Sequence, residues 1–215
     1  MLSPSNSISP TSEPVEPPYV QCRRFLTGGV RGGELTLDVG CGSGELIVDL
    51  AGLGCSVIGT EIDLALIEAC RERGLDVREG KAESLPFVEA SFDRIVCSVV
   101  VPYTDERRAI AEWARVLKPG GQVYATYHGV GYGLDYLVRG VDLRAHAYGA
   151  RMLANSVYYW TTGRRLPGFY GDTLCQGIGR LRSYYKALGL VLEQERIASS
   201  FLAQPQFICH QLVKL

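Results

Sequence analysis

Residues 35–46 read Leu35-Thr36-Leu37-Asp38-Val39-Gly40-Cys41-Gly42-Ser43-Gly44-Glu45-Leu46, a short apolar run that ends in an acidic residue and then has glycine at every second position. Glycine reaches positive φ at little cost and lets a ligand lie directly against the backbone. The pattern therefore predicts a strand-to-helix turn that carries a nucleotide-type cofactor. The alternative is a plain glycine-rich turn between a strand and a helix.

The charge and spacing of this turn narrow the class of ligand. A dinucleotide fingerprint needs its third glycine one residue later than Gly44, with a pyrophosphate at the start of the helix. Asp38 would repel a pyrophosphate, whereas a carboxylate can hold the ammonium of a sulfonium amino acid. The turn therefore favours a cationic ligand.

A second acidic residue ends the next apolar run, Cys55 to Glu61. Glu61 lies about 17 residues beyond Gly44, close to the spacing at which an acid binds ribose hydroxyls in nucleotide-binding units. We therefore expect Glu61 to bind the ribose of the cofactor. Asp63 precedes an apolar-periodic run and is expected to cap a helix over residues 64–73.

Five blocks occur in order along the chain: Leu37–Gly44, Val57–Asp63, Ala82–Phe87, Ser91–Val96 and Arg115–Gly121. Together they resemble class I S-adenosylmethionine-dependent methyltransferases of the small-molecule type, over about residues 35–126. Each block alone is weak, but five in order make a chance match improbable. The remaining chain fits the family only in outline.

The alternation of apolar and amphipathic segments predicts a parallel sheet flanked by helices, with ligands at the carboxyl ends of its strands. Strands are expected at 35–39, 55–60, 75–79, 93–97 and 121–127, and helices at 44–53, 64–73 and 105–116. The resemblance implies that a helix at 173–188 and strands at 190–199 and 206–214 complete the fold. That fold is a Rossmann-like three-layer α/β sandwich with a seven-stranded, mostly parallel sheet and an antiparallel last strand.

Two segments lie outside this core. Residues 1–18, rich in Ser and Pro, are expected to form a flexible tail, and residues 19–215 a single methyltransferase domain. Within it, residues 129–171 predict a helical cap after the fifth strand, its two helices broken near Gly140 or Gly149. Tyr19 and Phe25 either cover the cofactor or pack in the core.

The resemblance implies S-adenosylmethionine as the cofactor. The residues expected to bind it are Asp38, Gly40, Cys41, Gly42, Gly44, Glu61, Ile62, Ala82, Glu83, Cys97 and Ser98, and the last two should lie near the transferred methyl group. Lys81 stands where similar enzymes often carry an Asp that accepts from the adenine amino group, and a lysine can only donate. Adenine would then depend on the backbone of Ala82 and on Glu83.

Much of the acceleration of methyl transfer can come from alignment of the two reactants. A base helps only where the acceptor must lose a proton with a pKa above neutral. His128, at the end of the fifth strand, and Tyr103 are the candidates, and His128 is preferred because imidazole titrates near neutral pH. Alternatively, His128 only hydrogen-bonds the substrate or the backbone.

The charged and aromatic residues of the chain indicate which classes of partner it could bind. A net charge of −1 and an isoelectric point near 6.3 argue against a polyanion-binding surface over the whole protein. Residues 129–190 carry eight basic and three acidic residues, and Arg164-Arg165 either binds a planar anion or lies on a solvated face. The many aromatic residues of the cap suit a flat organic acceptor.

Three function classes follow. The first is methylation of a small organic acceptor, aromatic or anionic, at an oxygen, nitrogen or carbon atom. The second is RNA methylation, although the chain lacks the Asn/Asp-Pro-Pro-Tyr/Phe motif of many such enzymes. The third is a non-catalytic methyltransferase-like partner protein. Seven scattered cysteines without a Cys-x-x-Cys pair, and no apolar run long enough to span a membrane, predict a reduced, cytoplasmic protein without a metal site.

Overall fold

The computed structural model of the protein describes residues 16–215. Most of the expected flexible tail, residues 1–15, lies outside the described residues. Of the rest of that segment, Pro18 already belongs to a helix, α1 (Pro18–Leu26). The domain therefore begins slightly earlier than residue 19.

A seven-stranded sheet runs through the domain in the order β3-β2-β1-β4-β5-β7-β6. Its parallel part consists of β1 (Leu35–Val39), β2 (Ser56–Glu61), β3 (Val77–Glu79), β4 (Phe92–Ser98) and β5 (Leu117–His128). The hairpin of β6 (Leu190–Phe201) and β7 (Gln204–Lys214) closes it, with β7 antiparallel to both β5 and β6. The predicted seven-stranded sheet with an antiparallel last strand is confirmed.

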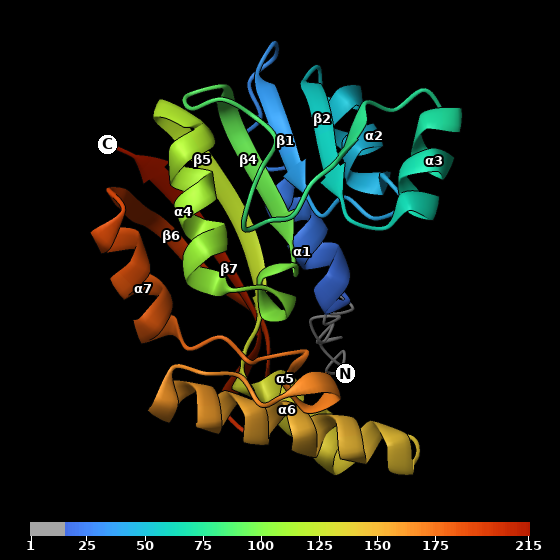
Figure 1. Ribbon diagram of the computed structural model, residues 1–215, viewed down its shortest axis with the longest axis vertical. Helices are drawn as coiled ribbons and strands as arrows, with labels where there is room; N and C mark the ends of the chain where they lie inside the picture. The colour runs from blue at the N-terminus through green and yellow to red at the C-terminus, as the bar shows by residue number, and fades with distance from the viewer. Residues whose placement is uncertain (1–15) are drawn as a thin grey trace, which may run out of the picture.

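Helices cover both faces of the sheet (Figure 1). On one face, α4 (Glu106–Val116) and α7 (Ile178–Ala187) bury Trp113 and Tyr185 against the largest apolar core. On the other face, α1, α2 (Glu45–Gly52) and α3 (Leu64–Glu72) pack over two smaller clusters. Because side chains of a strand alternate between faces, Leu37 enters the core under α4 and Asp38 points to the opposite face.

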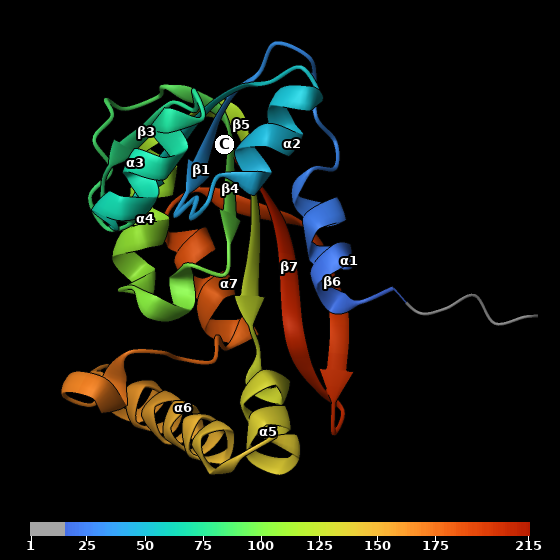
Figure 2. The ribbon, with the colours of Figure 1, turned by 90° about the vertical axis from the view of Figure 1, so that its right-hand side faces the viewer.

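The cap lies across one end of the sheet (Figure 2) and consists of α5 (Val130–Arg139) and α6 (Leu143–Thr162). The helices break at Gly140, and the side chain of Asp142 caps α6 by accepting from the backbone N–H of Ala145. Gly149, the other predicted break, lies inside α6. A Cβ atom there would come within 2.5 Å of the backbone nitrogen of Leu137, so this glycine lets the two helices touch.

The connection from the cap to the sheet differs from the prediction. After a short 3-10 turn, η2 (Gly168–Gly171), residues 173–176 are buried and belong to no helix or strand, and α7 begins at Ile178 rather than at 173. The backbone N–H of Leu174 donates to Pro102 O (3.0 Å) and that of Gln176 to His128 O (2.7 Å). These hydrogen bonds attach residues 174 and 176 to two separate parts of the chain. The segment therefore does not form the first turns of α7.

Among residues 16–215, no helix combines the length and the apolar character that crossing a membrane requires.

Candidate functional site

The glycine turn has the backbone that the sequence predicts, but glycine is required at its three positions for different physical reasons. All have positive φ: 70° at Gly40, 54° at Gly42 and 77° at Gly44. A Cβ atom at Gly40 would lie 2.4 Å from Val100 and one at Gly44 2.5 Å from Leu75, whereas a Cβ at Gly42 would meet open space. Gly42 therefore leaves backbone open to a ligand, while Gly44 serves the packing of α2 against α3.

Glu61 joins the end of β2 to this turn. One carboxylate oxygen, Oε2, accepts from the backbone N–H of Gly42 (3.0 Å), and Oε1 accepts from those of Ile62 (2.7 Å) and Asp63 (3.2 Å). A carboxylate has about four acceptor positions, so Glu61 can hold the turn and still accept from a diol. Asp63 caps α3 as predicted, with its side chain accepting from Ala65 N (2.9 Å).

Asp38 is the least satisfied group of the site. Its side chain is 1% exposed, and Oδ2 has no hydrogen-bond partner among the residues that the structure describes. Burial, and then the negative charge of Glu61, raise the pKa of Asp38 to about 7. A buried carboxylate without a partner is costly, so this position favours the arrival of a cation.

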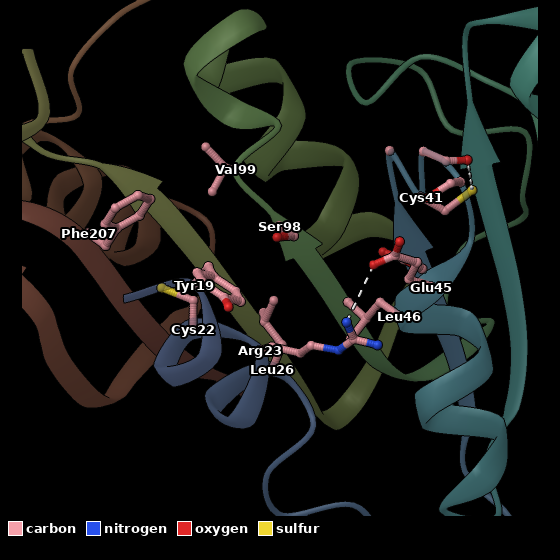
Figure 3. Close-up of a pocket in the computed structure, with 14 residues that line it drawn as sticks. Tyr19, Cys22, Arg23, Leu26, Cys41, Glu45, Leu46, Ser98, Val99 and Phe207 are labelled. Carbon is pink, nitrogen blue, oxygen red and sulfur yellow. Dashed lines mark hydrogen bonds and ion pairs between the residues drawn. The ribbon is translucent and has the colours of Figure 1, made fainter. Parts of the chain in front are cut away.

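A cleft with two halves follows the carboxyl ends of the strands. The α1 half has a volume of about 380 Å³ and lies between α1, the glycine turn and the end of β4 (Figure 3). The β2 half, about 510 Å³, lies beyond the end of β2. Gly40 and Val99 line both halves, so the two halves meet at these residues.

The predicted cofactor residues line this cleft except Gly44 and Cys97, which neither half includes among its described lining residues. The α1 half contains Asp38, Gly40, Cys41, Gly42 and Ser98. The β2 half contains Gly40, Glu61, Ile62, Ala82, Glu83 and Tyr103. The topology thus brings together residues from four separate blocks of the chain.

Cys97 was expected in the cleft, and this prediction is wrong. Its side chain is fully buried in the core shared with α4. Strand alternation gives the reason, because Ser98 faces the cleft and its neighbour must face the other way. Burial raises the pKa of the Cys97 thiol to about 12, which makes it an inert core residue.

Several lining residues escaped the sequence analysis: Arg23, Leu46, Val99 and Phe207. Val99 carries the clearest structural signal, since its φ of 57° is a left-handed backbone rarely seen in β-branched residues. Its N–H donates to Thr126 O (3.1 Å). No local sequence pattern announces such a conformation; it depends on the contacts around the end of β4.

Helix α1 forms a wall of the cleft. Tyr19 lines the α1 half, but Phe25, the other candidate lid residue, is buried with its ring 5.6 Å from that of Tyr124. Arg23 pairs with Asp49 and, at 3.4 Å, with Glu45 of α2. Surface ion pairs of this kind contribute little stability, so Arg23 mainly orients α1 against α2.

The β2 half offers other groups that could hold an adenine-sized ligand, although Lys81 stands where similar enzymes often carry an Asp. Lys81 and the exposed Ile62 line its mouth, and Ala82 is buried in its wall. Oε1 of Glu83 accepts from the backbone N–H of Asp105 (3.0 Å). The remaining acceptor positions of Glu83 therefore lie at a fixed place beside the cleft.

His128 lies behind the cleft. Its ring is 5% exposed and stacks on Tyr132, with centroids 3.7 Å apart, and it meets the edges of Phe207 (5.5 Å) and Tyr103 (6.4 Å). Among the described lining residues of either half, Phe207 and Tyr103 appear and His128 does not. Burial lowers the pKa of His128 to about 4, so the ring is neutral near pH 7.

This low pKa predicts a loss of stability in mild acid. The unfolded chain takes up a proton at His128 near pH 6.5, whereas the folded protein does so only near pH 4, so stability decreases as the pH falls through this range. The His128→Phe variant should lack up to about 3 kcal/mol of this decrease. Urea unfolding of both proteins between about pH 7.5 and 4 measures it, and parallel stability curves would contradict the expectation.

Several arginines of segment 129–190 face acidic side chains, and two of these acids come from outside the segment. Arg180 faces Glu106 (3.8 Å), Arg182 pairs with Glu195 (3.0 Å) and Arg151 with Asp172 (2.8 Å). Within the same segment, Arg139 faces Asp135. The segment therefore presents much less positive charge than its sequence suggests.

The guanidinium of Arg165 donates to backbone oxygens of the protein and is therefore not free to bind an anion. Its guanidinium donates to the backbone oxygens of Pro102 (3.2 Å) and Gly171 (3.1 Å), and also to that of Thr104. These bonds attach the end of the cap to η1 (Val101–Tyr103). Of the Arg164-Arg165 pair, only Arg164 is exposed, so the pair does not form a free fork for a planar anion.

Comparison with known proteins finds methyltransferases among those that this chain resembles. Residues 37–125 match the family model described as a methyltransferase domain. A probable tRNA methyltransferase 9B of Mus musculus is 40% identical over 112 residues, which cover 49% of this chain and 24% of that protein. The biotin biosynthesis bifunctional protein BioHC of Cellvibrio japonicus is 35% identical over 99 residues, 44% of this chain and 20% of that protein.

The chain thus spans a quarter or less of the length of these two relatives, and the similarity concerns one part of each. Among solved structures, an S-adenosylmethionine-dependent methyltransferase of Methanosarcina mazei superimposes with a TM-score of 0.66 at 21% identity, covering 86% of this chain and 94% of that one. A likeness at this identity concerns the fold.

Proposed function

We propose that this chain, which carries a class I S-adenosylmethionine-dependent methyltransferase domain, transfers the methyl group of that cofactor to a small organic acceptor through an oxygen, nitrogen or carbon nucleophile. The observation that carries the proposal is the buried Asp38 carboxylate, one oxygen of which has no partner within residues 16–215, beside a glycine turn whose Gly42 opens to the cleft. Such a group fits the ammonium of a sulfonium amino acid.

The residues that line the two halves of the cleft suit the ammonium, the ribose and the adenine of S-adenosylmethionine in turn. Asp38 would hold the ammonium, Glu61 the ribose hydroxyls, and the β2 half between Ile62 and Glu83 the adenine. When bound, the cofactor supplies a methyl group on a sulfonium, which is a very good leaving group. Ser98 and Val99, near the junction of the halves, then border the region where an acceptor must be aligned.

The surroundings of the cleft favour an aromatic acceptor over an anionic one. Tyr19 and Tyr103 line the two halves and are 70% and 53% exposed as residues. Free ring faces suit a flat organic molecule. The arginines that would attract an anion are largely paired with acids or bound to backbone oxygens.

We infer that the protein works mainly by alignment of the acceptor. A base with a pKa of about 4 is a poor proton acceptor at neutral pH. His128 also lies behind Tyr103 and Phe207. Its role in this proposal is to fix those two rings, and Tyr103 is the residue in contact with the acceptor.

The test is calorimetric titration of the protein with S-adenosylmethionine and with S-adenosylhomocysteine, with micromolar binding expected for both. Near pH 7 about half of the Asp38 carboxyls carry a proton, given a pKa of about 7. The arriving ammonium favours the ionised form, so binding should release protons and tighten between about pH 6 and 8.

Proton release is measured as a difference in binding enthalpy between two buffers of unequal ionisation enthalpy. The Asp38→Asn variant serves as the control, because it removes the titrating carboxyl and should remove the buffer dependence. Binding without any buffer dependence in the natural protein would contradict the role of Asp38. Failure of both ligands to bind would point to a non-catalytic, methyltransferase-like partner protein.

A second candidate function is methylation of tRNA. It is favoured by the 40% identity to the mouse protein named as a probable tRNA methyltransferase. RNA binding by phosphate contacts weakens steeply with salt. Strong, salt-dependent affinity for unfractionated tRNA would favour this candidate over a small acceptor.

A further inference from the structure

Two cysteines from opposite ends of the chain meet beneath the α1 half of the cleft. Cys22 lies in α1 and Cys209 in β7, with their sulfur atoms 3.8 Å apart. Their side chains are 6% and 0% exposed and share an apolar cluster with Phe25 and Tyr124. Both are free thiols in the structure. A disulfide has a sulfur–sulfur distance of about 2.05 Å, so the sulfurs would have to approach by a little under 2 Å.

The pair can be reached through the cleft. Cys22 lines the α1 half beside Tyr19, as Figure 3 shows, while Phe207, two residues before Cys209 on the same strand, lines that half as well. A small solute that enters the cleft can therefore contact Cys22, with Cys209 directly behind it. S-adenosylmethionine in the proposed position would block this approach.

The surroundings favour Cys22 as the first sulfur to react. Arg196 is the β6 residue paired with Cys209 across the hairpin. The hydrogen bond with Cys209, and to a smaller degree the charge of Arg196, lower the pKa of Cys22, although burial opposes them. Thiolates are the reactive form of cysteine. In Cys209 the same hydrogen bond and burial raise the thiol pKa. Of the two cysteines only Cys22 is among the described residues that line the α1 half, so a solute in the cleft meets Cys22 first.

We infer that Cys22 and Cys209 form an oxidation site for hydroperoxides, whose disulfide product fastens α1 to β7. The Cys22 sulfur attacks one oxygen of hydrogen peroxide, the O–O bond breaks, and water leaves to give a sulfenic acid. The Cys209 sulfur then forms the S–S bond as the S–O bond breaks and a second water leaves. In total, two thiols are oxidised and one peroxide is reduced to two waters.

The consequence concerns the wall of the cleft. Helix α1 contributes Tyr19, Cys22 and Arg23 to the lining, and a bond to β7 would fix its position and turn the Cys22 sulfur toward the sheet. The part of this inference that concerns the cofactor rests on the proposed function; the formation of the bond does not.

The experiment treats the reduced, full-length protein with hydrogen peroxide and follows the intact mass, a peptide map and hydrogen exchange of α1. We expect a loss of about 2 Da, a linked pair of peptides containing Cys22 and Cys209, and slower exchange of residues 18–26, all reversed by dithiothreitol. The Cys22→Ser variant should form no link. The Cys209→Ser variant should stop at a sulfenic acid on Cys22 that dimedone traps.

Cys55 provides the matched control, because it is buried in the same apolar cluster: the Cys55→Ser variant should still form the link. Absence of the Cys22–Cys209 peptide, or a link that leaves exchange in α1 unchanged, would overturn the inference. Saturating S-adenosylhomocysteine should slow the oxidation at least tenfold. A link that forms equally fast with this ligand, in a protein that calorimetry shows not to bind it, would count against the proposed function and leave the oxidation site standing.

Discussion

The Asp38→Asn variant is expected to bind S-adenosylmethionine at least about 30-fold more weakly than the natural protein. Removing one partner of a buried, hydrogen-bonded charge pair costs about 2–5 kcal/mol, which corresponds to this range of affinity. The same change should raise the stability of the free protein, since it removes a buried carboxylate whose Oδ2 has no partner in residues 16–215.

The prediction is specific because the same substitution should weaken cofactor binding and raise the stability of the free protein. Calorimetry measures the affinity, and thermal unfolding without ligand measures the stability. The control is Asp76→Asn, an exposed acid of the same type, which should change neither quantity. A variant at Asp38 that binds the cofactor as well as the natural protein does would show that the ammonium is held elsewhere.

The Glu61→Ala variant should also weaken cofactor binding by about 100-fold, for a different reason. Its carboxylate accepts from the backbone N–H groups of Gly42, Ile62 and Asp63. Loss of the side chain therefore removes the proposed ribose partner and the hydrogen bond to the glycine turn. Losing charged hydrogen bonds of this kind costs about 1.5–3 kcal/mol each.

Adenosine separates the two roles, because it has the ribose and the adenine but no amino acid part. We expect adenosine to bind the Asp38→Asn variant as it binds the natural protein, and to bind the Glu61→Ala variant much more weakly. Glu68→Ala, on the exposed face of α3, is the control. Equal loss of adenosine binding in both variants would contradict the assignment of Asp38 and Glu61 to different parts of the ligand.

The sheet and the cofactor turn could be predicted because their signals are local. The positive φ of Gly40, Gly42 and Gly44 follows from the glycine spacing, and the place of Glu61 follows from the length of one helix and one strand. The last two strands of the seven-stranded sheet were implied by the resemblance to class I methyltransferases and not by local signals. The boundary predicted for the last helix was wrong because tertiary hydrogen bonds hold residues 174 and 176 outside it.

Other properties of the site depend on residues that only the fold brings together. Arg180 and Arg182 of α7 face Glu106 and Glu195, which come from α4 and β6. The pKa of His128 is low because the ring is buried among aromatic side chains, including Tyr132 of the cap and Phe207 of the last strand. Counting charges or histidines along the chain cannot reveal such neighbours.

By itself the sequence determined the strand-to-helix turn, the acidic residues beside it and the sheet that supports them, since backbone dihedral preferences and strand alternation act over a few residues. The tertiary structure alone decided which titratable groups are buried, which arginines are already paired, and that Cys22 and Cys209 face each other across 187 positions. Desolvation and Coulomb interactions depend on distance in space, and distance along the chain does not report it.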